Sequence, residues 1–250
     1  CEIISRIEEK SRKCKTGEIP LNISIGFATK ENPDESIYSI IKKAENSMKQ
    51  AKLIKSKKVS NEIILSIKRK LSLKSRSSTE ISKRIKKLAV EFAKFIKLPK
   101  AEVENLNLLS DFHDIGKVAI KRNILLKKSN LNDSEWQIMK MHPEIGFRIA
   151  KSSTHLSQIA DAILAHHEHW DGSGYPYNIK GRKIPLISRI IAIIEAYDAM
   201  VYGRNYKDPV SAEEAIKELK KQSRKQFDPQ LVSKFIEMLQ NRQENLSLFS

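Results

Sequence analysis

The stretch TEISKRIKKLAVEFAKFI, residues 79–96, decides the fold of this chain because apolar residues recur in it at the period of an α-helix. Ile81, Ile85, Leu88, Phe92 and Ile96 fall on one face of that helix. A helix of this kind buries its apolar face against other elements. We therefore expect residues 79–96 to form one side of a packed core.

The sequence that follows predicts further helices rather than strands. The helical period returns over 101–113, 133–140, 143–151, 156–167, 186–203, 211–222 and 229–240. The 250 residues include only 8 Gly and 8 Pro, which is few for the many turns of a β-sandwich. The sequence therefore predicts a mainly α fold.

The first 73 residues follow a different pattern. Residues 21–28 alternate apolar and polar side chains, which predicts a strand, and residues 36–55 have a helical period. We expect the charged run 55–58 to end this helix and a second helix to follow over 61–73. One strand and one helix cannot close a core, so this segment is predicted to be part of an α/β domain, with a boundary near 58–61.

Charge and cysteine content exclude several classes of protein. Of the charge of +16, a large share lies between Ser66 and Lys100, where twelve Lys or Arg accompany two Glu. Without interleaved aromatic residues, this stretch favours a solvated helix face over a DNA or RNA groove. Cys1 and Cys14 are too few for a disulfide framework. No apolar run approaches the ~20 residues of a membrane span, and no leader opens the chain, so we expect a cytoplasmic protein.

Three strings carry the residues that can do chemistry. They are His113-Asp114-Ile115-Gly116-Lys117, His142-Pro143-Glu144-Ile145-Gly146, and HHEHWDGSGYP over residues 166–176. Imidazole and carboxylate ligands suit divalent Fe, Mn or Zn, and a carboxylate can bridge two metals that activate water for attack on phosphorus. Lys117 follows Asp114 by three residues, so it is placed to neutralise a phosphate oxygen.

These strings resemble those of the HD-GYP family of metal-dependent phosphodiesterases. His113-Asp114 matches the HD pair and Gly174-Tyr175-Pro176 the GYP loop, and the likeness covers about residues 74–240. The resemblance implies a helical HD-domain bundle that hydrolyses cyclic di-GMP to pGpG or GMP. It also implies two divalent metal ions, with Fe or Mn expected.

The resemblance also implies a role for individual residues. Asp114 and Lys117 would be catalytic, and Asp114 would bridge the metals. Lys117 and Arg204 would contact phosphates, while Tyr175 and Pro176 would lie beside the nucleotide and near a surface that binds GGDEF-domain proteins. The implied metal ligands are His113, Asp114, His142, His166, His167 and Glu195.

The sequence departs from the family pattern at a few positions. Ile81 stands where a family histidine binds metal, and Ser77 stands where the family has Glu. Glu195 replaces the usual Asp, and Arg224 replaces a Gly. Isoleucine has no lone pair to donate, so one of the two metal sites is predicted to be weakened.

The N-terminal segment resembles the C-terminal part of a GGDEF (diguanylate cyclase) domain through residues 22–28, 44–45 and 51–52. The string that names that family is missing, so we expect no nucleotide synthesis here. The predicted layout is a GGDEF-like part over 1–58, a connecting helix over 59–73 and an HD-GYP domain over 74–250. Because the chain begins with Cys1, we expect it to be a piece of a longer protein.

Three functions remain open at this point. The first is a cyclic di-GMP phosphodiesterase of reduced activity. The second is a degenerate domain that binds cyclic di-GMP or a partner protein without turnover. The third, nucleic-acid binding, rests only on charge and predicts steeply salt-dependent affinity. The helices over 61–96 are compatible with a homodimer and equally with packing inside one chain.

Overall fold

The computed structural model describes residues 2–13, 15–16, 19–20, 23–74, 78–203 and 208–247. The chain divides into two compact units, Cys1–Ile63 and Ile64–Ser250. Within the described ranges, no helix combines the length and the apolar character that a membrane crossing requires.

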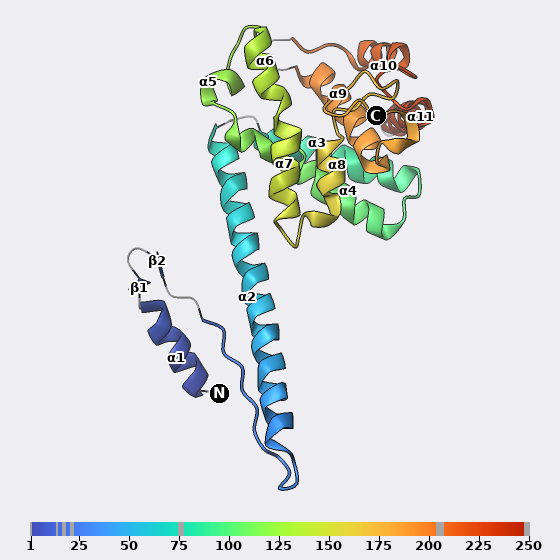
Figure 1. Cartoon of the computed structure of the whole chain (residues 1–250). Helices are drawn as coiled ribbons and strands as arrows, with labels where there is room; N and C mark the ends of the chain where they lie inside the picture. The colour runs from blue at the N-terminus through green and yellow to red at the C-terminus, as the bar shows by residue number, and fades with distance from the viewer. Residues whose placement is uncertain are drawn as a thin grey trace. The chain divides into compact units, whose positions relative to one another are not determined.

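In the described part of the first unit, regular structure consists of helices and two short strands. Helix α1 (Glu2–Lys13) precedes two short antiparallel strands, β1 (Lys15–Thr16) and β2 (Ile19–Pro20). Helix α2 (Ile37–Lys74) begins in this unit and ends in the second (Figure 1).

Two predictions for this region are wrong. Residues 23–28 form no strand, because strands β1 and β2 pair with each other and the described part of this unit offers no third strand beside 23–28. Helix α2 does not end at 55–58 but continues to Lys74. That run contains no Gly or Pro, and lysine is a good helix former, so its charges alone do not stop the helix.

The second unit is a bundle of helices, as predicted (Figure 1). Its long central helix α9 (Leu186–Tyr202) packs against five others. The helices and 3₁₀ turns around it are α3 (Ser78–Phe95), α4 (Lys100–Phe112), η1 (Ile115–Ala119), α5 (Arg122–Leu125), α6 (Asp133–Lys140), α7 (His142–Lys151), η2 (Ser157–Ile159), α8 (Ala160–Leu164), η3 (Gly181–Lys183), α10 (Ala212–Lys221) and α11 (Pro229–Ser247).

Residues 79–96, from which the fold was predicted, form one side of the core as expected. Ile85, Leu88 and Phe92 of α3 are buried in the core, and Ile81 and Ile96 pack against it while half-buried. The ring of Phe92 meets that of Phe235 edge to face at 5.2 Å, and Phe235 meets Tyr197 at 5.5 Å. These contacts join α3, α9 and α11 into one core.

One helix prediction in this unit is wrong in a way that matters for the site. Residues 156–167 were expected to be one helix, but α8 ends at Leu164 and residues 165–167 form a turn. The Nδ1 of His166 bonds to the carbonyl oxygen of Ile163 at 2.5 Å. Such local side-chain bonds compete with helix continuation.

Candidate metal centre

The structure brings the predicted ligands together from four places in the bundle. His113 and Asp114 follow the end of α4, His142 begins α7, His166 and His167 lie in the turn after α8, and Glu195 lies in α9. One group consists of Asp114, His142, His166 and His167, and a second consists of His113, Asp114 and Glu195. In each group the ligand atoms lie within 4.8 Å of one another, so each could hold a metal ion.

A glycine allows these elements to approach so closely. A Cβ atom on Gly116 in η1 would lie 1.9 Å from the carbonyl oxygen of His142 and 2.6 Å from the backbone nitrogen of Gly146. Only hydrogen fits in that space, so η1 and α7 touch backbone to backbone. This contact sets His142 beside Asp114.

The two oxygens of Asp114 face the two groups separately. Its Oδ1 lies 3.3 Å from Nε2 of His142 and 4.0 Å from Nε2 of His166. Its Oδ2 lies 3.6 Å from Nε2 of His113, which is itself 3.9 Å from Oε1 of Glu195. This is the arrangement that a bridging carboxylate requires.

Three histidines are oriented in the same way by backbone carbonyls. Nδ1 of His113, His142 and His166 lies within hydrogen-bond distance of the carbonyl oxygens of Leu109, Met139 and Ile163, at 3.1, 2.7 and 2.5 Å. A carbonyl only accepts, so each Nδ1 carries a proton, and in the neutral imidazole Nε2 then keeps its lone pair. This second bond fixes the ring for ligation.

Two observations indicate that a cation fits the group around His142. Nε2 of His142 and Nε2 of His166 face each other at 3.2 Å, and with both lone pairs in place neither can donate to the other. Buried Oδ1 of Asp114 also has no hydrogen-bond partner among the described residues. A metal ion between these atoms would satisfy all of them.

Electrostatics keep Asp114 charged and two of the imidazoles, those of His166 and His167, neutral. Burial by itself would raise the pKa of Asp114, but Lys117, His113 and His142 together hold that pKa well below its ordinary value. Burial, helped by neighbouring imidazoles, lowers the pKa of His166 and of His167 well below the usual range. These are the protonation states that bind metal.

Lys117 is directed at Asp114 in this structure. Its Nζ donates to Oδ2 of Asp114 at 2.7 Å, across three residues of sequence. The ammonium therefore lies at the same oxygen that faces His113. Arg204, the second residue expected at phosphate, lies outside the described residues.

The loop containing Tyr175 and Pro176 lies against the histidines. The ring of Tyr175 stacks on that of His167, with centroids 4.9 Å apart and an interplanar angle of 26°. Burial, with the nearby charges of Glu195 and Asp114, raises the pKa of the Tyr175 hydroxyl. The predicted nucleotide-binding tyrosine is thus placed beside the proposed ligands, and Pro176 follows it half-buried.

Glu168 anchors this loop. This role was not predicted from the sequence, although Glu168 belongs to the string over residues 166–176. The side chain is only 3% exposed, and its Oε1 accepts a bond from the backbone N–H of Tyr177 at 2.7 Å. A Cβ on Gly174 would lie 2.2 Å from the backbone nitrogen of His169, so only glycine permits the chain to fold back there. Burial raises the pKa of Glu168.

Two buried aspartates outside these strings, Asp198 and Asp228, serve the packing of the helices. Asp198 is fully buried and binds Arg84 through both oxygens at 2.7 and 3.1 Å, which joins α9 to α3. Asp228 binds Arg189 at 2.5 Å. A cavity of about 350 Å³ lined by Arg84, Tyr197 and Tyr202 includes none of the proposed ligands.

Comparisons with known proteins show what this chain resembles. The model of the HD domain family matches residues 61–231. A cyclic di-GMP phosphodiesterase of Thermotoga maritima is 39% identical over 159 residues, which are 63% of this chain and 43% of that protein. The 3'3'-cGAMP-specific phosphodiesterase 2 of Vibrio cholerae is 37% identical over 183 residues, or 72% of this chain and 35% of that protein. The chain spans less than half the length of these relatives.

A solved structure shows the same fold. The crystal structure of a cyclic GMP-AMP-specific phosphodiesterase of Vibrio cholerae superposes with a TM-score of 0.56 at 21% identity. The match covers 72% of this chain and 48% of that one. The family match extends over more than half of the chain and includes every proposed metal ligand. The chain belongs to the HD domain family.

Proposed function

We propose that this chain is a metal-dependent phosphodiesterase of the HD-GYP branch that hydrolyses cyclic di-GMP to pGpG or GMP. The observation that carries the proposal is the pair of ligand groups that share Asp114, one with His142, His166 and His167 and the other with His113 and Glu195. Paired metal sites of this kind are typical of enzymes that cleave phosphate esters. The substrates in the names of the relatives, cyclic di-GMP and 3'3'-cGAMP, are both cyclic dinucleotides.

In this proposal the ligands hold two divalent ions, with Fe or Mn favoured by the mixture of imidazole and carboxylate. When bound, such ions lower the pKa of water and offset charge that develops on a phosphate. Asp114 lies between the two groups and fixes their separation. The backbone carbonyls behind His113, His142 and His166 hold the imidazoles in the ligating tautomer.

The remaining site residues would act on the substrate. Lys117 carries its charge 2.7 Å from the shared carboxylate, where a phosphate bound between the groups would meet it. Arg204 is proposed for a second phosphate contact. Tyr175, stacked on His167, and Pro176 would border the nucleotide.

A second candidate function is a receptor that binds cyclic di-GMP without turnover. The observation that favours it is Ile81, which offers no ligand to the group of His113, Asp114 and Glu195 and packs against the core instead. That group has three ligands, whereas the group of His142 has four. We propose that the group of His113, Asp114 and Glu195 binds its ion more weakly than the group of His142.

The arrangement of the whole chain also remains a proposal. We propose a GGDEF-like part over 1–58, a connecting helix over 59–73 and the HD-GYP domain over 74–250, within a cytoplasmic signalling protein. Helix α2 covers the connecting stretch, which supports that part of the layout. A GGDEF-domain partner at the Tyr175 loop and a homodimer are further proposals.

The test of the proposed function is Asp114→Ala. Because Asp114 belongs to both groups, we expect the variant to lose bound metal and cyclic di-GMP hydrolysis together. Asp161→Ala is the matched control, since Asp161 is exposed and pairs with Lys151 at 3.4 Å. Full hydrolysis by Asp114→Ala would refute the proposal. Wild-type protein that binds cyclic di-GMP without hydrolysing it would select the receptor.

A further inference from the structure

Two aromatic rings and a lysine gather beside the proposed metal centre. The ring of Trp136 in α6 meets that of Tyr175 edge to face, with centroids 6.2 Å apart. Nζ of Lys140 lies 5.7 Å from the centroid of Trp136 and 5.6 Å from that of Tyr175. We call Trp136, Lys140 and Tyr175 the aromatic cluster.

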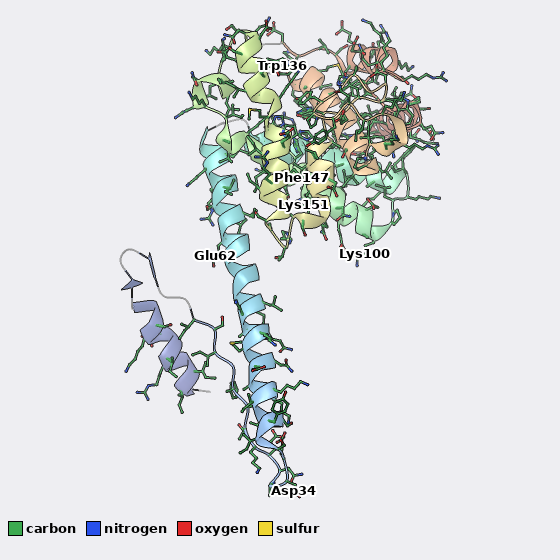
Figure 2. The ribbon with its side chains drawn as sticks, viewed as in Figure 1. Asp34, Glu62, Lys100, Trp136, Phe147 and Lys151 are labelled. Carbon is green, nitrogen blue, oxygen red and sulfur yellow. The ribbon has the colours of Figure 1, made fainter. Side chains whose placement is uncertain are left out.

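The aromatic cluster is not part of the core. Trp136 is 42% exposed, and α6 contributes no buried residue (Figure 2). Trp136 and Lys140 are four residues apart, so they share one face of α6. A large aromatic side chain exposed beside a reactive site is available to stack on a flat ligand.

The aromatic cluster is joined to the proposed ligands through one ring. Tyr175 contacts Trp136 edge to face and also stacks on His167, at 4.9 Å. In a nucleotide, each base lies one sugar away from the phosphate. A phosphodiester held at the histidines would therefore place a base in the direction of Trp136.

We propose that Trp136 and Lys140, with Tyr175, form a binding subsite for a purine base of the substrate and that Lys140 makes it selective for guanine. This inference rests on the proposed function, since it concerns the base attached to the phosphodiester at the metal centre. Stacking on an aromatic face tolerates any base. Selectivity has to come from a polar group, and Lys140 is the cation of the cluster.

The chemistry of lysine explains the preference for guanine. An ammonium group only donates hydrogen bonds. Guanine offers two acceptors on one edge, O6 and N7, whereas adenine offers N7 beside an amino group that itself donates. Lys140 would therefore bond to guanine and face an unfavourable donor on adenine.

The test compares Trp136→Ala and Lys140→Met with wild-type full-length chain supplied with Mn. Affinity for cyclic di-GMP and for cyclic di-AMP is measured, and hydrolysis products are analysed in the same samples. We expect Trp136→Ala to weaken binding of both ligands by roughly 5- to 150-fold, which is the usual range for loss of one stacked base. We expect Lys140→Met to reduce the preference for cyclic di-GMP by roughly tenfold.

Lys151→Met is the matched control for Lys140. Nζ of Lys151 also lies over a ring, 5.3 Å from the centroid of Phe147, but Lys151 ends α7 whereas His142 begins it. Figure 2 shows Lys151 and Phe147 well away from Trp136 in the view. This variant should bind both ligands as wild type does.

A spectroscopic readout tests stacking without relying on a loss of affinity. The chain has two tryptophans, so Trp170→Phe leaves Trp136 as the only one. We expect cyclic di-GMP to quench the fluorescence of that variant. Unchanged fluorescence at saturation would overturn this inference but not the proposed function. The same holds if Trp136→Ala and Lys140→Met keep wild-type affinities while the wild type hydrolyses cyclic di-GMP. A wild type that binds no cyclic dinucleotide would overturn the proposed function as well.

Discussion

The substitution Gly116→Ala tests whether the contact between η1 and α7 builds the metal centre. The added Cβ would lie 1.9 Å from the carbonyl oxygen of His142, while Cβ atoms essentially never approach closer than 3.0 Å. The two backbones would therefore have to separate by about 1.1 Å. Functional sites tolerate shifts of about 0.5 Å, so His142 would no longer reach the position that a shared ion requires.

The expected cost has two parts. Overpacking of this kind destabilises a protein by about 1–3 kcal/mol, which lowers the melting temperature by roughly 2–12 °C for a domain of this size. Metal affinity should fall by about 10- to 100-fold or more, as it does when the support of a ligand is lost. Thermal unfolding with and without Mn, and metal content after dialysis, measure both effects.

Gly181→Ala is the control for this substitution. Gly181 has a φ of +61°, so alanine costs about 1–2 kcal/mol in backbone strain there, but its Cβ would meet no atom within 4 Å. The control should lose stability without losing metal. A Gly116→Ala protein with wild-type melting temperature and wild-type metal content would refute the reasoning.

Three further substitutions test separate features of the structure. Ile81→His should raise metal content and hydrolysis by supplying a ligand to the group of His113. No gain in either quantity would show that a histidine at position 81 does not reach the metal. Arg224 has a φ of +68°, so Arg224→Gly should relieve strain of about 1 kcal/mol and raise the melting temperature by roughly 2–4 °C; an unchanged or lower value would contradict this. Glu168→Ala removes the oxygen that accepts the Tyr177 N–H, a bond worth about 1.5–3 kcal/mol, and should speed amide hydrogen exchange at Tyr177; unchanged exchange would argue against the anchor.

Much of the second unit could be predicted from periodicity because helices such as α3 and α4 bury one apolar face. The prediction for residues 133–140 matches α6 residue for residue, and those for 79–96 and 101–113 are within one residue at each end of α3 and α4. Capping supports such boundaries, since Asn132 and Glu135 form a capping box at the start of α6.

The failures have a common physical cause. Residues 23–28 alternate like a strand, but alternation says nothing about whether a neighbouring strand exists to bond to. At the turn 165–167, the side chain of His166 bonds to a backbone carbonyl, a competitor of helix continuation that periodicity does not register. The pattern of apolar residues in a segment therefore predicts a helix or strand correctly only when the rest of the structure supplies the hydrogen-bond partners that this helix or strand needs.

The proposed ligands could be named from the sequence because its strings resemble those of a family with a recognisable ligand pattern, and imidazole and carboxylate are groups that bind divalent metals. What the sequence could not reveal is that the two oxygens of Asp114 face different groups. Trp136 and Lys140 were missed because a tryptophan and a lysine four residues apart are ordinary on a helix surface. Their contact with Tyr175 joins segments some forty residues apart and is visible only in three dimensions.

The most direct test of the account is metal content per chain, measured with cyclic di-GMP turnover on the same sample under reducing conditions with Mn and Fe supplied. Two ligand groups that share Asp114 predict about two metal ions per chain, the second more weakly held, together with pGpG or GMP as product. One ion or none, with no product, would contradict the phosphodiesterase account, and retained binding of cyclic di-GMP in that sample would identify a receptor instead.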